Sequence, residues 1–199
     1  MKLSWQSGVL CFAFLVSSCV PTLRGVQVPI PSERIFQKGY SLVPLNEKGW
    51  VITRRDPYGL ILGKNPDNPD ETFVILANHT KLPAFKSNED LVGLVKQEYA
   101  KNIDPSRLKI VIHEVTAYIE KGPNCARTHV VAEDHAALKR SGKRGLMILE
   151  ELWLTCAHPK DNNIGVFVTY SHRYDRDQRD PKFLDKATMV LSSVEFTDL

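Results

Sequence analysis

The sequence predicts one α+β domain in which helices pack on the faces of an antiparallel β-sheet. The expected order is three strands, one helix, four strands and a second helix. Runs of strands separated by single helices favour antiparallel pairing, because parallel strands need a long crossover connection. The chain of 199 residues is 43% hydrophobic and 25% charged, a composition typical of a domain with a packed core.

The N-terminal segment predicts export from the cell. Lys2 precedes residues 8–16, an apolar run too short to span a bilayer, which takes about 20 residues. A positive charge followed by a short apolar run is typical of a signal peptide. The next residues, Val16-Ser17-Ser18-Cys19, resemble the lipobox of bacterial lipoproteins.

This resemblance implies that residues 1–18 are removed and that Cys19 becomes the lipid attachment site. It implies a diacylglyceryl group on the thiol and an acyl chain such as palmitate on the amine. Several acyl chains give a lasting membrane anchor, whereas one chain binds a membrane only marginally. Val20, where an aspartate resembles a signal for inner-membrane retention, implies the outer membrane and the periplasm. A plain secretory leader that ends near a cysteine is the alternative.

Residues 19–34 are expected to form an extended tether before a single globular domain at residues 35–199. The segment has no amphipathic period and contains three prolines, Pro21, Pro29 and Pro31. Three apolar residues alternate along it: Val26, Val28 and Ile30. This alternation leaves open that part of the segment packs as an edge strand.

The first half of the domain predicts three strands and a helix. Residues 49–55 and 58–64 are apolar runs that a hairpin turn at Asp56-Pro57 would join, and residues 71–78 form the third strand. Ser87, with Asp90 three residues later, is typical of a helix N-terminus. The helix is expected to end before Asp104-Pro105. Its apolar face consists of Leu91, Val92, Val95, Tyr99 and Ile103.

The second half predicts four strands and a last helix. The strands are expected at residues 107–120, Cys125–Leu138, residues 146–158 and residues 164–170. A turn at Ser141-Gly142 separates the second from the third, on which apolar residues alternate: Leu146, Ile148, Leu152 and Leu154. Asp180 is expected to cap the last helix, with Pro181 at its first position. The apolar face of that helix contains Phe183, Ala187, Val190, Leu191 and Val194.

The element order and two short strings resemble the PsbP family, the extrinsic photosystem II proteins and their bacterial relatives. The strings are Gly49-Trp50-Val51-Ile52 and residues 190–196, and the resemblance covers about residues 40–196. It implies a central antiparallel sheet with helices on its faces. Relatives in that family mostly act as binding or assembly modules, which argues against an enzyme only by analogy.

Cys125 and Cys156 predict a disulfide bond. Removal of the leader takes away Cys11, and lipidation uses Cys19, so these two cysteines remain in an oxidising compartment. They lie at equal distances along the chain from a turn near residues 140–141, and a hairpin would therefore place them opposite each other. The Cys-x-x-Cys spacing of redox and metal sites is missing.

The sequence contains no motif for catalysis or cofactor binding. Gly-x-Ser-x-Gly, His-Glu-x-x-His and a glycine-rich phosphate loop are all missing. Ser171 and His172 are neighbours on a predicted strand, so their side chains point to opposite faces and cannot act together. Glu150 and Glu151 fail the same test, although one of them could be buried and paired.

Two charged or metal-binding features also have plain structural interpretations. One face of a predicted strand carries His129, Glu133 and His135, a possible metal-ligand set, but a solvated polar face is the preferred interpretation. The most basic cluster is expected to be a solvated hairpin tip: Lys139, Arg140, Lys143 and Arg144. The net charge of +3 gives no electrostatic case for a nucleic-acid partner.

Together these observations predict an exported, membrane-anchored lipoprotein of the cell envelope. We expect a non-enzymatic binding or assembly module without a cofactor, whose partners are the membrane and an envelope protein. The alternative is a periplasmic hydrolase whose site is assembled from distant residues. A deep pocket that gathers His129 or His172 with a carboxylate would favour the enzyme, and a shallow apolar patch would favour binding.

Overall fold

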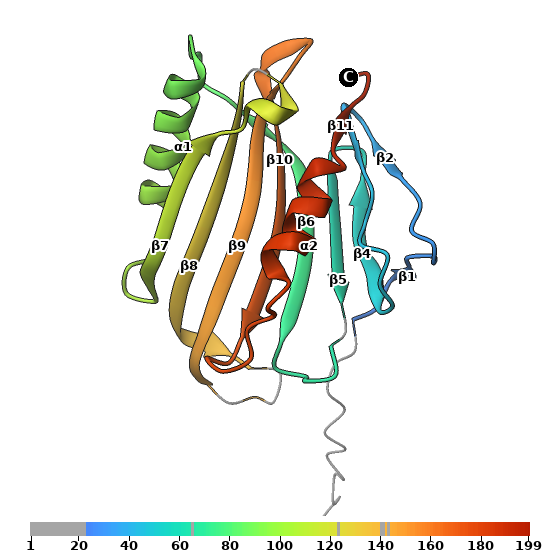
Figure 1. Ribbon diagram of the computed structural model, residues 1–199, viewed down its shortest axis with the longest axis vertical. Coiled ribbons are helices and arrows are strands. Elements are labelled where there is room, and N and C mark those ends of the chain that lie inside the picture. The colour runs from blue at the N-terminus through green and yellow to red at the C-terminus, as the bar shows by residue number, and fades with distance from the viewer. Residues whose placement is uncertain (1–22, 65, 123, 140–141, 143) are drawn as a thin grey trace, which may run out of the picture.

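An eight-stranded antiparallel sheet forms the body of the protein (Figure 1). The computed structural model describes residues 23–64, 66–122, 124–139, 142 and 144–199. The order across the sheet is β1 (Val26–Gln27), β4 (Trp50–Asp56), β5 (Gly59–Lys64), β6 (Thr72–Lys81), β10 (Asp161–Tyr174), β9 (Arg144–His158), β8 (Cys125–Leu138) and β7 (Leu108–Ala117). The predicted antiparallel sheet is therefore confirmed.

The two helices pack on opposite faces of this sheet. α2 (Phe183–Ser192) crosses in front of β9 and β10, whereas α1 (Asn88–Asn102) runs alongside β7 and β8 (Figure 1). Along β9, Leu152 and Leu154 belong to the core beneath α2, and Trp153 between them belongs to a core on the α1 side. This is the expected two-residue period of a strand that is buried on both faces.

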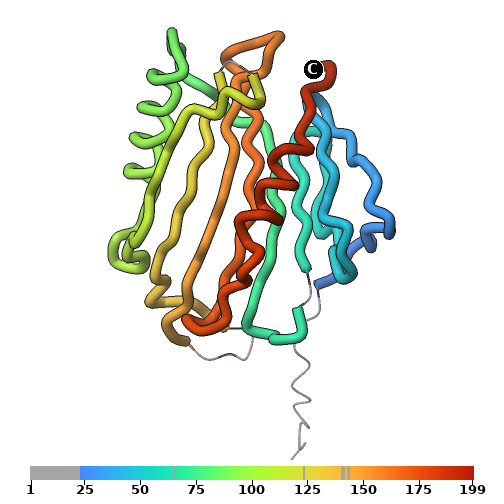
Figure 2. The backbone as a smooth tube through the Cα atoms, viewed as in Figure 1, coloured from blue at the N-terminus to red at the C-terminus, as the bar shows by residue number. Residues whose placement is uncertain are grey.

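A second sheet of three short strands adds to the core on the α2 side. Its order is β11 (Glu195–Phe196), β3 (Tyr40–Leu42) and β2 (Ile35–Gln37), all antiparallel. The backbone path brings the C-terminal end of the chain beside these early strands (Figure 2), where the amide of Gly39 donates to the carbonyl of Asp198 at 2.8 Å. The PsbP-like string at residues 190–196 implies a last strand after the helix, and β11 lies there. The sequence pattern predicts neither β2 nor β3, because segments of three residues carry too little alternation.

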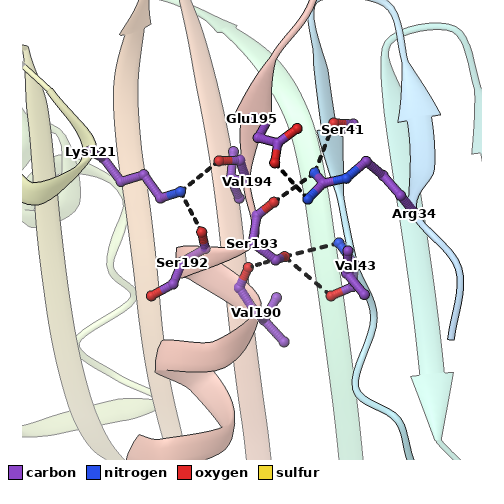
Figure 3. Close-up of polar contacts among 9 residues, drawn as sticks. All are labelled: Arg34, Ser41, Val43, Lys121, Val190, Ser192, Ser193, Val194 and Glu195. Carbon is purple, nitrogen blue, oxygen red and sulfur yellow. Dashed lines mark hydrogen bonds and ion pairs between the residues drawn. The ribbon is translucent and has the colours of Figure 1, made fainter. Parts of the chain in front are cut away.

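The expected tether is wrong for the described part of that segment, residues 23–34. Val26–Gln27 pairs with β4 at the edge of the large sheet, as the alternative interpretation allowed, and Val28 is buried in the main core. The guanidinium of Arg34 donates to Ser41 Oγ and to the carbonyl of Ser193, at 3.1 and 2.8 Å (Figure 3). The domain therefore begins before residue 35, because apolar and polar contacts both hold this segment.

The C-terminal end of α2 is capped by a side chain from outside the helix. Lys121, in the short 3-10 helix Ile119–Lys121, donates from Nζ to the carbonyl of Ser192 and, at 2.7 Å, to that of Val194 (Figure 3). The hydroxyl of Ser193 donates to the carbonyl of Val190 at 2.7 Å and accepts from the amide of Val43 at 2.9 Å. A cation at a helix C-terminus is favoured by the helix dipole.

The helix boundaries confirm one prediction and correct another. Ser87 caps α1 by accepting from the amide of Asp90 at 3.2 Å, and the helix ends at Asn102 as expected. Asp180 accepts from the amide of Lys182 at 2.9 Å, but α2 begins only at Phe183. Pro181 therefore lies in a turn before the helix and not at its first position, because the Asp180 side chain closes that turn first.

The strand boundaries also differ from the predicted ones. The segment expected at residues 107–120 ends as a strand at Ala117 and continues into the 3-10 helix. β10 continues to Tyr174, beyond the predicted end at residue 170, because its last residues pair with both β6 and β9. No helix among the described residues is long and apolar enough to cross a membrane.

Candidate functional site

A groove of about 480 Å³ separates the C-terminal half of α1 from the sheet. The sheet contributes Trp153 and Thr155 from β9 and Phe167 from β10, and the helix contributes Leu94 and Tyr99. The volume falls in the range of small-molecule sites, about 300–1,000 Å³. We call this hollow the α1 groove.

Three aromatic rings make the wall of the α1 groove. The ring centroids of Tyr99 and Trp153 are 5.6 Å apart, and those of Trp153 and Phe167 are 6.0 Å apart, in tilted arrangements. Trp153 is 7% exposed, so its indole is held firmly between the helix and the sheet. Behind Tyr99, the ring of His113 on β7 packs at 4.2 Å. The wall is therefore a fixed apolar surface.

α1 covers only part of this face of the sheet. Four apolar residues of the uncovered part are half-buried: Ile61, Val74, Leu76 and Phe167. They come from β5, β6 and β10, and β6 and β10 also line the groove. The groove thus opens onto an apolar surface.

Glu151 places a carboxylate inside this apolar wall. It precedes Trp153 by two residues on β9 and so shares its face. Among the described residues, the Glu151 carboxylate has no hydrogen bond and no ion pair. Burial raises the pKa of Glu151, and the nearby charge of Arg173 opposes this only in part. Burial and the charge of Glu151 together raise the pKa of Tyr99 to about 12.

Neither the family models nor the curated proteins compared with this chain include a match. The candidate site therefore stands on its own residues. Three aromatic rings and the carboxylate of Glu151 face the same hollow, the exposed Glu98 lies at its rim, and the hydroxyl-bearing Thr80 and Thr155 also line it. This arrangement can bind an apolar molecule and contribute one charge to orient it.

The opposite face of β9 contains a different carboxylate cluster, centred on Glu150. Arg179 donates two hydrogen bonds to Glu150, at 2.7 and 2.8 Å, and the hydroxyl of Tyr174 donates a third at 3.1 Å. His129 Nε2 lies 3.0 Å from the same carboxylate. Burial raises the pKa of Glu150, but these hydrogen bonds outweigh it and hold the pKa at about 2. The prediction that one of the two glutamates is buried and paired is confirmed.

His172 is buried near this cluster, between two aromatic rings. Its ring stacks on Phe73 at 4.0 Å and on Tyr174 at 4.5 Å. Neither ring nitrogen has a hydrogen bond within the part of the chain that is described, and Nε2 lies 3.5 Å from Glu71 Oε1. Burial lowers the pKa of His172 to about 4, so the ring is neutral at pH 7.

The conditions set for the hydrolase alternative are only half met. His129 and His172 both lie close to carboxylates, as that alternative requires. Neither histidine lines the α1 groove or the second, smaller hollow over β5 and β6. Ser171 points to the other face of the sheet from His172, as predicted, because the two are neighbours on β10.

The possible metal-ligand set separates in the structure. His129 contacts Glu150, whereas Glu133 pairs with Lys109 and Arg176 at 3.3 and 2.8 Å. His135 lies 3.4 Å from Glu133, within the stretch where the register between β8 and β9 shifts. No group of three metal-ligating side chains occurs among the residues that the structure describes.

The disulfide between Cys125 and Cys156 is present, as predicted. The two residues are direct partners in the register of β8 and β9, and their Cα atoms lie 4.1 Å apart. Both are 1% exposed and belong to the core on the α2 side. The bond joins the end of this hairpin that lies farthest from its turn.

Two other predictions fall partly or wholly outside the described residues. The signal peptide at residues 1–18 and the lipid attachment at Cys19 lie outside them, as do Arg140 and Lys143 of the basic hairpin tip. Lys139 is described, and its Nζ lies 2.5 Å from Asp175 Oδ1. It is therefore paired, contrary to the expectation of a simply solvated tip, because the loop after β10 comes close to it.

Sequence reasoning missed the α1 groove. The sequence pattern places Tyr99 on the core face of α1 and suggests Glu151 only as a partner of Glu150. The available signal was on β9, where Glu151, Trp153 and Thr155 alternate with the leucines of the other face. A large aromatic on the second face of a buried strand predicts that something packs there. The sequence does not say how much space remains.

Proposed function

We propose that this chain is an exported, membrane-anchored lipoprotein that binds a small apolar ligand in the α1 groove without transforming it. The lipobox-like Val16-Ser17-Ser18-Cys19 supports the anchor. The mature domain faces the periplasm from the outer membrane in this proposal. The sheet order and the helices on both faces also support a PsbP-like sandwich.

The observation that carries the binding role is the aromatic wall of Trp153, Phe167 and Tyr99 beside a hollow of about 480 Å³. A preformed apolar hollow with few polar groups is the usual form of a small-molecule site. The wall is fixed by the core, so little side-chain ordering opposes binding.

The test uses a neutral fluorescent apolar probe, N-phenyl-1-naphthylamine, with a soluble Cys19→Ala variant of the mature chain. We expect the probe to brighten on binding and Leu94→Trp to abolish the effect, because Leu94 lines the groove and a larger side chain fills it. Leu184→Trp is the matched control, since Leu184 is 43% exposed on α2 and lies away from the groove. Equal brightening in the two variants would contradict binding in the α1 groove.

A further inference from the structure

We infer that the ligand of the α1 groove carries an ammonium group on an apolar body, and that Glu151 is the counter-ion of this ammonium. The inference rests on the proposed binding function and adds the chemical class of the ligand. The carboxylate of Glu151 lies in an apolar wall, yet none of the described residues forms a hydrogen bond or an ion pair with it.

Three other carboxylates that are withdrawn from the surface of this protein have cationic partners. Glu150 is bound by Arg179, Asp134 by Arg107 at 2.7 Å, and Glu47 by Lys64 and Lys186 at 2.6 and 3.0 Å. Glu151 differs from all of them, because it has neither a hydrogen bond nor an ion pair among the described residues. A carboxylate withdrawn from water without a partner is costly, and a cation supplied by a ligand removes that cost.

The cations of the protein itself are engaged or placed at the rim. Arg173, whose charge acts on Glu151, lies 3.5 Å from the fully buried carboxylate of Asp134. Lys81 and Lys101 line the outer part of the groove, and both are exposed to solvent. Among the described residues, none of these three cations forms an ion pair with Glu151, so a cation from a ligand would be its first such partner.

The aromatic wall favours the same class of ligand. Trp153 lines the groove two residues after Glu151 on the same strand, and Tyr99 lines it from the facing helix. An ammonium group is attracted to the face of an aromatic ring, most strongly to tryptophan, and more so when it is withdrawn from water. A carboxylate and aromatic faces around one hollow thus select an ammonium over a neutral or anionic group. The apolar body of the ligand then lies along Phe167 and Leu94.

The experiment compares three probes of one size: 4-phenylbutylamine, the neutral 4-phenylbutanol and the anionic 4-phenylbutyrate. Binding is measured by titration calorimetry and by the NMR shift of the Trp153 indole N–H in the Cys19→Ala variant. We expect the amine to bind at least tenfold tighter than the alcohol, and the acid to bind weakest. Glu151→Gln should bring the amine and alcohol affinities together and improve binding of the acid, a gain that a misfolded variant cannot show.

Glu98→Gln is the matched control, because it removes the same charge from an exposed carboxylate at the rim of the groove. It should keep the tenfold preference for the amine. If the preference survives in Glu151→Gln, the counter-ion role is overturned. If amine and alcohol bind equally to the protein that retains Glu151, the ligand is not selected for an ammonium group, while the proposed binding function stands. If none of the probes shifts Trp153, both proposals fail.

An ammonium on an apolar body can come from a free alkylamine or from a phospholipid headgroup. Competition against bound 4-phenylbutylamine distinguishes these sources. Displacement by lysophosphatidylethanolamine and not by lysophosphatidylglycerol supports a lipid headgroup, and displacement by neither supports a free amine. Equal displacement by both lipids would contradict selection through Glu151, since only the first carries an ammonium.

Discussion

The guanidinium of Arg179 donates two hydrogen bonds to the carboxylate of Glu150, at 2.7 and 2.8 Å. Glu150 is fully buried in β9, and Arg179 lies half-exposed in the loop that leads from β10 to α2. Such a bidentate ion pair is among the stronger and more directional hydrogen-bonded pairs in proteins. This pair holds the loop before α2 against β9, inside the large sheet.

Glu150→Gln and Glu151→Gln should therefore have different effects on stability, although the two residues are adjacent. Glu150→Gln removes the charge from hydrogen bonds with Arg179, and we expect the free energy of unfolding to fall by about 2–3 kcal/mol. Glu151→Gln removes an unpaired charge from an apolar wall, so a loss above about 0.5 kcal/mol is not expected. Urea unfolding at pH 7 measures both losses. Equal losses would contradict the conclusion that Glu150 is held by an ion pair and Glu151 is not.

His172 should make the fold sensitive to acid. Its pKa is about 4 in the folded protein and about 6.5 when unfolded, so the unfolded chain binds an extra proton between these values. The free energy of unfolding should thus fall as the pH drops from 6.5 to 4, by at most about 3 kcal/mol. The charged groups that act on this ring are Asp180, Glu150, Lys186 and Arg179, with Glu71 at 3.5 Å.

The variant His172→Phe should flatten this part of the pH profile. Phenylalanine keeps the stacking on Phe73 and Tyr174 and cannot take up a proton. An unaltered slope in His172→Phe would show that other groups cause the acid sensitivity.

The disulfide should contribute measurably to stability. Cys125 and Cys156 are 31 residues apart in sequence, and the chain-entropy model gives roughly 3.7 kcal/mol for a loop of this size. Cys125→Ala/Cys156→Ala should lose a few kcal/mol yet remain folded, because the core on the α2 side includes many other residues. Thiol labelling of the denatured, unreduced Cys19→Ala protein after export checks the bond. Labelling at both positions would show that it does not form.

Cys19 should carry the membrane anchor. Mass spectrometry of the mature N-terminus is expected to find cleavage before Cys19, a diacylglyceryl group on its thiol and an acyl chain on its amine. Cys19→Ala should move the protein from the membrane to the soluble fraction. Cleavage at another position, or an unmodified Cys19, would leave the chain without the proposed anchor.

The sequence by itself determined the features that depend on neighbouring residues. Alternation along β9 predicted a strand with a buried face, and Ser87 with Asp90 predicted the start of α1, because backbone geometry makes these patterns local. The sequence also predicted the disulfide, since the position of one turn sets which residues of a hairpin lie opposite each other.

Tertiary structure decided the rest. β6 pairs with β10 although an α-helix, a 3-10 helix and three strands separate them in sequence. Strands of two or three residues form only because partners are already in place. The α1 groove also depends on elements that are distant in sequence. Tyr99 and Trp153 meet because α1 packs across the sheet, and the space left beside them depends on the side chains of β6, β9 and β10 together. Periodicity tells which face of an element is buried, but the volume between two packed elements is a property of both.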